Sequence, residues 1–276
     1  MQAQLSHFAL NGQVLPTTQF ADALVEGQTS VYEVIKIIDS RPVFLREHLQ
    51  RLEQSLERAG FAPTWAQPVR SAIPALLSQC PVERHNIRVA IVFDDAGQHL
   101  RSAVYFIASR YPSPDDYRHG VAVGIMPAER SNPTAKVEQL GLRQLANRMM
   151  AEQGLFEVLL ENGQGLITEG SRSNVFAVRN GGLITAPDDA VLGGITRDVV
   201  LAIARRSGIA VELRCPSTAE LDTLEAMFIT GTSPCVLPVR RCGSMNLNAQ
   251  HPLVTSLAQQ YAQAEAADID RLHQHK

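Results

Sequence analysis

A glycine-rich turn is the first feature of this sequence whose residue types and spacing indicate chemistry. Leu192–Asp198 has the sequence LGGITRD and leads into an apolar-periodic helix expected over about 195–207. The first turn of a helix presents unpaired N–H groups and a partial positive charge, and glycines let an anion approach that backbone. With Gly194, Ile195 and Thr196 at its start, this helix is predicted to bind phosphate, although many such turns are only turns.

Three further groups could contribute to a ligand site. The segment 230–233 (TGTS) again combines glycine with hydroxyls after a strand, and Gly231 and Thr232 are its candidates. Arg51 lies beside a leucine stripe, where a guanidinium fork suits phosphate, or it is an ordinary exposed arginine. Glu169, in LITEGSRSNVF, is a carboxylate just before a strand. It could pair with a protonated ring nitrogen or simply be solvated.

Amines are scarce in this chain. It has 22 arginines but only three lysines, Lys36, Lys136 and Lys276, and the last of these ends the sequence. Replacement of lysine by arginine across a surface is a common compositional trend. If the protein uses an amine for covalent chemistry, however, Lys36 and Lys136 are the two internal candidates.

The elements that must position these residues alternate between strands and helices. Asn11-Gly12 predicts a tight hairpin over 7–15. Strands are expected at 30–38, 86–93, 102–109, 121–126, 156–160 and 173–178, with a strand–turn unit at 227–239; helices are expected at 46–59, 66–79, 138–153, 195–207 and 251–265. Pro-rich and charged residues at 113–119 predict a linker between two α+β domains, 1–112 and 120–276.

Composition narrows the class of protein. The chain has 276 residues, 45% of them hydrophobic, and a formal net charge of −3, so no basic surplus indicates nucleic acid. No apolar run approaches a membrane-spanning length, and the N-terminus does not resemble a signal peptide, so we expect a cytoplasmic protein without a membrane partner. The four cysteines form no C-x-x-C pair, and no metal site is expected.

Taken in order, these motifs resemble one family. The succession R…K…TEGSRSNVF…GGITRDVV…TGTSPCVLPV is similar to the class IV aminotransferases, which include branched-chain aminotransferases, D-amino acid aminotransferases and 4-amino-4-deoxychorismate lyase. The resemblance covers nearly the whole chain. It implies a two-domain α+β fold of type IV, pyridoxal 5'-phosphate in the cleft between a small N-terminal and a larger C-terminal domain, and a homodimer.

The resemblance also implies roles for individual residues. Lys136, 33 residues before Glu169, would carry the cofactor as a Schiff base and shuttle a proton, while Glu169 would hold the pyridine nitrogen protonated. The phosphate ligands would be Arg51, Ile195, Thr196 and Thr232, and Leu192 would pack on the ring. The reaction would be amino transfer between an amino acid, of D- or branched-chain type, and a 2-oxo acid. A lyase releasing 4-aminobenzoate and a catalytically inactive cofactor-binding homologue are the alternatives.

The chain departs from the family pattern near its lysine. Most members have K-[ST]-x-N, but here the residues are Lys136-Val137-Glu138-Gln139. Gly141 replaces an aromatic residue that commonly binds the cofactor's phenolic oxygen, so the group on that side is unidentified.

Substrate recognition is also only partly indicated. VYEVIK is closer to the D-amino acid enzymes than to the VFEGIR of branched-chain enzymes, yet the RGxxxRxH carboxylate trap of the D-specific enzymes is not intact in SRYPSPDDYRHG. By resemblance Tyr32, Val34 and Lys36 would line the substrate pocket. Candidate carboxylate-binding residues are Arg88, Arg110 and Arg130, and Arg172 could bind a substrate anion or form a supporting salt bridge.

Overall fold

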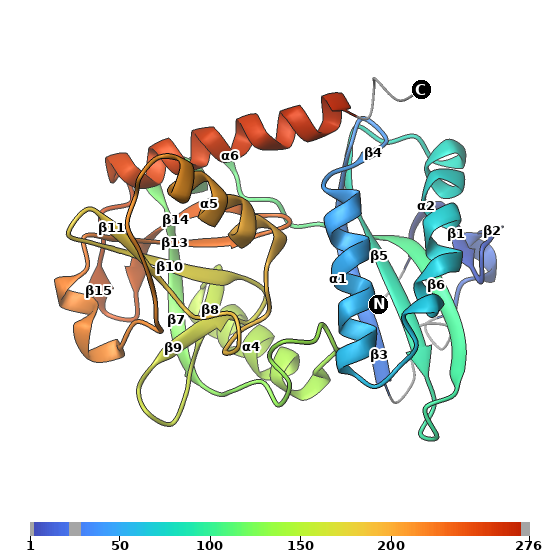
Figure 1. The fold of residues 1–276 in the computed structure, drawn as a ribbon, viewed down its shortest axis with the longest axis horizontal. Helices are drawn as coiled ribbons and strands as arrows, with labels where there is room; N and C mark the ends of the chain where they lie inside the picture. Colours follow the sequence, from blue (N-terminus) through green and yellow to red (C-terminus); the bar gives the residue numbers. More distant parts are fainter. Residues whose placement is uncertain (1–2, 22–28, 272–276) are drawn as a thin grey trace. The chain divides into compact units, whose positions relative to one another are not determined.

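The structure, a computed structural model, describes residues 3–21 and 29–271 (Figure 1). The chain forms two compact units, each built around its own sheet. Unit 1 comprises Met1–Arg110, Ala135–Glu138 and Glu265–Lys276, and unit 2 comprises Tyr111–Thr134 and Gln139–Ala264. A short segment from the middle of the chain and the end of the last helix therefore complete the N-terminal unit.

Unit 1 contains a six-stranded antiparallel sheet in the order β2-β1-β6-β5-β3-β4. Its strands are β1 (Gln4–Leu10), β2 (Gln13–Pro16), β3 (Thr29–Ile38), β4 (Arg41–Pro42), β5 (Arg84–Phe93) and β6 (His99–Ile107), with a 3-10 turn η1 at Thr17–Gln19. Asn11 and Gly12 both have positive φ angles, as a tight two-residue turn between antiparallel strands requires. The predicted hairpin is therefore confirmed.

Two helices cover one face of this sheet (Figure 1). They are α1 (Leu45–Arg58) and α2 (Gln67–Gln79), preceded by a 3-10 turn η3 (Pro63–Ala66). Leu52 and Leu56 of α1 join Val31 and Ile35 of β3 in one buried apolar cluster. Successive side chains of a strand point to opposite faces of the sheet. The residues directly before and after Val31 and Ile35 in the sequence therefore lie on the face of the sheet opposite to α1.

Unit 2 contains a nine-stranded mixed sheet in the order β12-β11-β10-β13-β14-β7-β8-β9, with β15 paired to β14. The strands are β7 (Val121–Pro127), β8 (Glu157–Glu161), β9 (Ile167–Gly170), β10 (Asn174–Arg179), β11 (Gly182–Thr185), β12 (Val211–Leu213), β13 (Ala226–Gly231), β14 (Cys235–Cys242) and β15 (Met245–Asn246). The helices are α3 (Pro114–His119), α4 (Leu140–Gln153), α5 (Ile195–Arg206), a 3-10 helix η4 (Thr218–Thr223) and α6 (Pro252–Arg271), whose end from Glu265 onward belongs to unit 1. None of the helices in the described ranges is long and apolar enough to span a bilayer.

Two segments differ from the sequence-based expectation. The predicted linker 113–119 is the helix α3, which belongs to unit 2. Its start is fixed by a capping box between Ser113 and Asp116 and by Pro114 in the first turn, so local backbone chemistry makes it helical despite its polar composition. The last helix also continues beyond 265 to Arg271.

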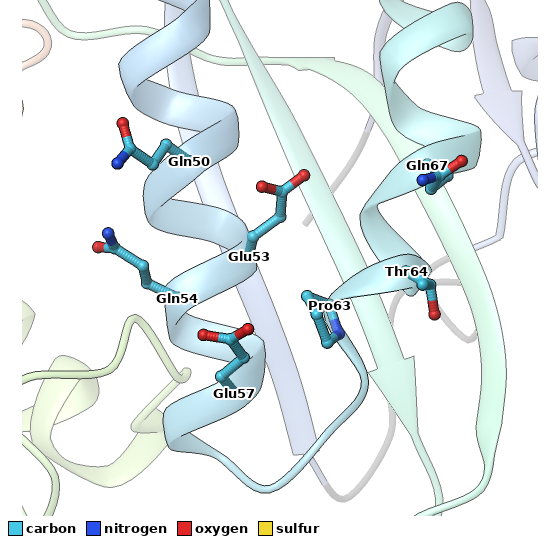
Figure 2. A pocket seen from close by; sticks show the side chains of 7 residues that line it. All are labelled: Gln50, Glu53, Gln54, Glu57, Pro63, Thr64 and Gln67. Carbon is cyan, nitrogen blue, oxygen red and sulfur yellow. The ribbon is translucent and has the colours of Figure 1, made fainter.

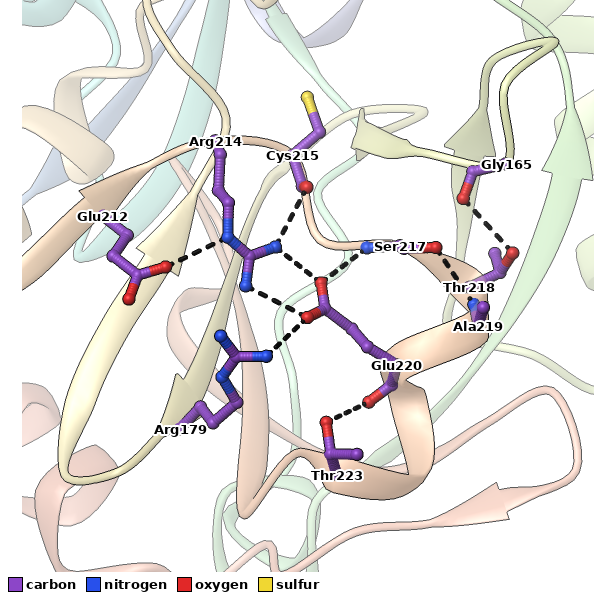
Figure 3. Close-up of polar contacts among 10 residues, drawn as sticks. All are labelled: Gly165, Arg179, Glu212, Arg214, Cys215, Ser217, Thr218, Ala219, Glu220 and Thr223. Atoms are coloured by element: carbon purple, nitrogen blue, oxygen red, sulfur yellow. Dashed lines mark hydrogen bonds and ion pairs between the residues drawn. The ribbon is translucent and has the colours of Figure 1, made fainter.

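A polar network fixes the start of η4 (Figure 3). Glu220 accepts a hydrogen bond from the backbone N of Ser217 at 2.7 Å, from two nitrogens of Arg214 at 2.6 and 3.0 Å, and from Arg179 at 2.8 Å. The hydrogen bond from Arg214 is the main cause that lowers the pKa of Glu220 below its ordinary value. This carboxylate therefore stabilises the folded state most in its ionised form.

We predict that Glu220→Gln destabilises the protein by about 1 kcal/mol at neutral pH, the usual effect of losing a helix cap. Because the folded-state pKa is depressed, the wild-type advantage should be complete above about pH 4.5 and should shrink as the pH falls below that value. Thermal unfolding at pH 7 and pH 3 measures this. Glu212→Gln, which removes a mostly exposed carboxylate from the same Arg214, is the control, and it should change the midpoint little.

Candidate active site

Glu169 lies near the end of β9, and its side chain is buried in unit 2. Its carboxylate forms an ion pair with Arg130, whose Nε is 2.8 Å from Oε1. Arg130 also donates from Nη2 to the carbonyl of Ser171 at 2.7 Å, which fixes the guanidinium beside the TEGSRSN loop. Arg130 thus balances the buried charge of Glu169, as a carboxylate removed from water requires.

A second carboxylate, Glu157 of β8, organises the same loop. It accepts hydrogen bonds from the hydroxyls of Ser171 at 2.6 Å and Ser173 at 3.0 Å, and from the backbone N of Arg172 at 3.1 Å. This role of Glu157 was not predicted from the sequence. The only signal was an acidic residue in a predicted apolar strand at 156–160.

The LGGITR turn has the predicted geometry of a helix start. α5 begins at Ile195, with Gly194 in extended conformation before it and no side chain capping the first turn. Thr196 is buried, and its hydroxyl lies 3.4 Å from that of Tyr261. N–H groups of an uncapped first turn are available to an anion.

Asn174 connects this turn to the sheet. Its side-chain amide donates to the carbonyl of Leu192 at 2.8 Å, and a Cβ placed on Gly194 would overlap its Oδ1. Asn174 is also opposite Thr230 in the β10–β13 pairing, so the TGTS turn follows directly on the neighbouring strand. Three of the predicted binding motifs thus come together in unit 2.

The TGTS turn contributes one unusual atom. The hydroxyl of Thr230 is buried and has no hydrogen-bond partner among the described residues. Gly231 ends β13, and Thr232 begins the turn toward β14. A buried hydroxyl without a partner is costly unless a ligand or water completes it.

Lys136 belongs to the segment Ala135–Glu138, which lies along the edge of β3 in unit 1. Its carbonyl accepts from the backbone N of Tyr32 at 3.1 Å, and its own N–H donates to the hydroxyl of Ser55 at 3.2 Å. The N–H of Glu138 donates to the carbonyl of Ser30 at 3.0 Å. Backbone hydrogen bonds on both sides therefore hold the residue, and its Nζ lies 5.0 Å from the centroid of the Tyr32 ring.

Arg51 of α1 is held by Glu33, a fully buried residue of β3 that sequence analysis did not single out. Both of its oxygens accept from the guanidinium at 2.7 Å, and Oε2 also lies 2.8 Å from Nδ1 of His48. Burial raises the pKa of Glu33, but the charge of Arg51 and the hydrogen bonds from His48 and Arg51 outweigh it, so that pKa lies well below its ordinary range. Burial lowers the pKa of His48.

The other lysine described, Lys36, is also on β3. Its Nζ donates to both carboxylate oxygens of Glu265 at 2.9 Å, within unit 1. Tyr32, Val34 and Lys36 alternate with the residues that face α1, so they share one face of the strand. Val34 is paired in register with Arg88 of β5.

The four candidate arginines for substrate binding have different surroundings. Arg88 is almost completely buried and donates to Glu138 at 2.6 Å, whereas Arg110 is exposed after β6. Arg172 is exposed, and its guanidinium donates to the side chain of Asn147. Arg130 pairs with Glu169 as described above. Arg88 is thus the candidate enclosed beside Tyr32 and Lys136.

The surface groove drawn in Figure 2 is separate from these residues. Its walls come from the polar side of α1 and from η3 with the start of α2, and they consist of Gln50, Glu53, Gln54, Glu57, Pro63, Thr64 and Gln67. It contains no predicted site residue. Among the described residues there is also no group of three or more His, Cys, Asp or Glu side chains that could hold a metal ion.

The chain is similar to known aminotransferases in sequence and fold. The family model described as amino-transferase class IV matches residues 30–242. A probable branched-chain-amino-acid aminotransferase of Thermotoga maritima is 29% identical, covering 82% of this chain and 81% of its own. The branched-chain-amino-acid aminotransferase of Escherichia coli K12 is 28% identical over 80% and 82%. A solved branched-chain aminotransferase from Thermoproteus uzoniensis, with norvaline, superposes with a TM-score of 0.82 at 22% identity, covering 96% of each chain.

The chain therefore belongs to the class IV aminotransferase family. Enzymes of this family use pyridoxal phosphate, and the protein is a pyridoxal-phosphate-dependent aminotransferase with the mixed helix and sheet fold expected from its motifs. The relatives favour amino transfer over the lyase and over an inactive homologue.

The residues present fit this cofactor. In unit 2 the uncapped start of α5 and the unpartnered hydroxyl of Thr230 suit a phosphate group, and the buried Glu169 suits a cationic ring nitrogen. In unit 1 Lys136 supplies a primary amine, the kind of group that can bind this cofactor covalently. Gly141 lies in the first turn of α4 with open space around its Cβ position, so it leaves room where the family has an aromatic side chain.

We predict that Gly194→Ala weakens cofactor binding at least about tenfold, because its methyl group would displace Asn174 from Leu192 and shift the start of α5. Titration of the apoprotein with pyridoxal phosphate, followed by absorbance, measures the affinity. Gly193→Ala is the matched control, since open space surrounds a Cβ there. Equal losses in the two variants would contradict the role given to the Asn174 contact.

Proposed function

We propose that Lys136 is the amine that binds pyridoxal phosphate covalently, and that the enzyme moves an amino group between an amino acid and a 2-oxo acid. The fixed position of Lys136 beside the Tyr32 ring carries this proposal. Lys36 is bound by both oxygens of Glu265, whereas the backbone of Lys136 is anchored and its amine lies against the Tyr32 ring. Lys276 lies outside the described residues.

The protein's own groups then have distinct tasks. Bound pyridoxal phosphate supplies an electron sink for the pair of electrons left when a proton leaves the substrate Cα. The Lys136 amine would take that proton and return it to C4′ of the cofactor, the carbon on the other side of the transferred nitrogen, so it must be neutral when it acts. Glu169 holds the ring nitrogen in its protonated form, and Arg130 keeps the carboxylate in position.

Phosphate binding is proposed for the start of α5, with Ile195 and Thr196, and for Thr232 and Arg51. For Arg51 the support is its bidentate pairing with Glu33, which fixes the plane of the guanidinium before any ligand arrives. For α5 the support is its uncapped first turn. Leu192, tied through its carbonyl to Asn174, is proposed to pack on the ring face.

We propose an amino donor of branched-chain type. The curated relatives named above are branched-chain aminotransferases or probable ones. The VYEVIK strand resembles the D-amino acid enzymes instead, so stereospecificity is tested directly by the donor panel below. Tyr32 and Val34 are the proposed pocket-lining residues of this strand.

A homodimer is proposed as the working assembly. Its support, besides the family resemblance, is the outer surface of α4, where Leu140 is 60% and Leu145 57% exposed. The two leucines are five positions apart, so they point in different directions around the helix, and Leu145 is the one tested below.

The test of the cofactor assignment is borohydride reduction of the protein with pyridoxal phosphate, followed by peptide mass mapping. A phosphopyridoxyl adduct is expected on the Lys136 peptide in the wild type and not in Lys136→Ala. Lys36→Arg, which keeps the pair with Glu265, should retain the adduct. An adduct on the Lys36 peptide instead would overturn the assignment.

The reaction is tested with L- and D-amino acids as single donors, without an acceptor. Branched-chain donors should convert the bound cofactor to its amino form and release the matching 2-oxo acid, seen by absorbance and by mass spectrometry. Failure with every donor would contradict amino transfer. Pyruvate release from aminodeoxychorismate, without an added 2-oxo acid, would indicate the lyase.

The assembly is tested by Leu145→Glu, which places a charge on the exposed surface of α4. Analytical ultracentrifugation should show a dimer for the wild type and a shift to monomer for the variant, by about tenfold or more in the dissociation constant. Leu213→Glu, at a similarly exposed leucine on β12, should remain a dimer.

A further inference from the structure

An ion pair between Arg88 and Glu138 adjoins the proposed catalytic lysine in unit 1. Arg88, on β5, is 2% exposed, and its Nη2 donates to Oε2 of Glu138 at 2.6 Å. Its guanidinium carbon lies 4.2 Å from the centroid of the Tyr32 ring, and Nζ of Lys136 lies 5.0 Å from the same centroid. The ion pair and the Lys136 amine thus both lie against the same tyrosine ring.

The pair is incompletely satisfied. Nε of Arg88 and Oε1 of Glu138 are both buried, and neither has a hydrogen-bond partner among the residues that the structure describes. One donor and one acceptor thus remain inside the protein with nothing from those residues to bind. Such atoms are costly in a purely structural ion pair, but they are expected where a ligand or water completes the site.

We propose that Glu138 sets the charge of the substrate side chain that this enzyme accepts. The inference rests on the function proposed above and adds the substrate class: amino acids whose side chains carry no negative charge. An unpaired guanidinium beside Tyr32 would attract a side-chain carboxylate, as in glutamate or 2-oxoglutarate. Glu138 neutralises that guanidinium, and its second oxygen is buried without a hydrogen-bond partner among the described residues, so an acidic side chain bound beside the pair would be repelled.

The position of Glu138 follows from the backbone. Its N–H donates to Ser30, and Val137 forms an antiparallel bridge with Val31 at the edge of β3. Lys136 and Glu138 flank Val137, so their side chains leave the same side of the segment. Glu138, which neutralises Arg88, and Lys136, which is proposed to carry the chemistry, are therefore two positions apart on one short extended segment.

The test compares glutamate with the best neutral donor of the same stereochemistry. In Glu138→Gln the ratio of kcat/KM for glutamate to that for the neutral donor should rise about tenfold or more, the usual effect of one charge-assisted hydrogen bond. The gain should appear mainly in KM for glutamate. Glu83→Gln, at an exposed glutamate of the same unit, should leave the ratio unchanged.

A second readout does not depend on turnover. Glutarate, an unreactive dicarboxylate, should bind the Glu138→Gln holoenzyme about tenfold more tightly than the wild type by calorimetry, and its affinity should fall as salt is added. The double variant Arg88→Gln/Glu138→Gln removes both charges and avoids a buried unpaired guanidinium. It should lose the gain for glutamate and for glutarate while remaining folded.

The outcomes separate this inference from the function on which it rests. If the wild type reacts with no amino donor, the proposed function fails first. If the wild type reacts with neutral donors but Glu138→Gln shows an unchanged ratio and no tighter glutarate binding, only the charge-setting role is overturned. A uniform gain for acidic and neutral donors would also overturn it, because Arg88 would then be binding the carboxylate that all donors share.

Discussion

Charge removed from water must be balanced nearby, and this requirement governs the regions of the protein where the site residues lie. Glu33 is enclosed completely and holds Arg51 and His48 in fixed positions. Glu169 is balanced by Arg130. Separating either pair would leave a buried charge uncompensated, which destabilises a protein by several kcal/mol, about 3–5 in measured cases. The same side chains proposed to meet the cofactor therefore also hold their elements together.

Rigid support surrounds the binding turns of unit 2. Glu157 accepts three hydrogen bonds from the TEGSRSN loop. Asn174 of β10 donates a hydrogen bond to the LGGITR turn. Neither residue is proposed to touch substrate. Their effect is to fix backbone N–H groups and carboxylates before a ligand binds, which reduces the ordering that binding requires.

Much of the fold was predictable because its signals are local. The Asn11-Gly12 hairpin, the leucine stripe of α1 and the glycine turn before α5 depend on periodicity or on backbone angles that few residues adopt, and all three are confirmed. The helix at 114–119 was mistaken for a linker because its composition is polar, although its capping box was present in the sequence.

The ion pairs could not have been predicted in this way. Glu33 meets Arg51 across 18 positions, Arg88 meets Glu138 across 50, and the partners are chosen by which strands become neighbours. An acidic residue in an apolar strand, as at Glu33 and Glu157, is the one local signal of such a partner. Such a residue indicates that another part of the chain must supply a cation or a hydrogen-bond donor, but the sequence does not indicate which part.

The composition of unit 1 has a consequence for how the protein is made. Its sheet is drawn from the first 110 residues, yet Ala135–Glu138 lies along the edge of β3, and the carboxylate that pairs with Lys36 comes from Glu265. A nascent chain leaves the ribosome from its N-terminus, so β3 lacks its edge segment until residues 135–138 have been made, and Lys36 lacks the counter-charge of Glu265 until that residue has been made. The N-terminal unit can therefore reach its final state only after the chain has been made through α6.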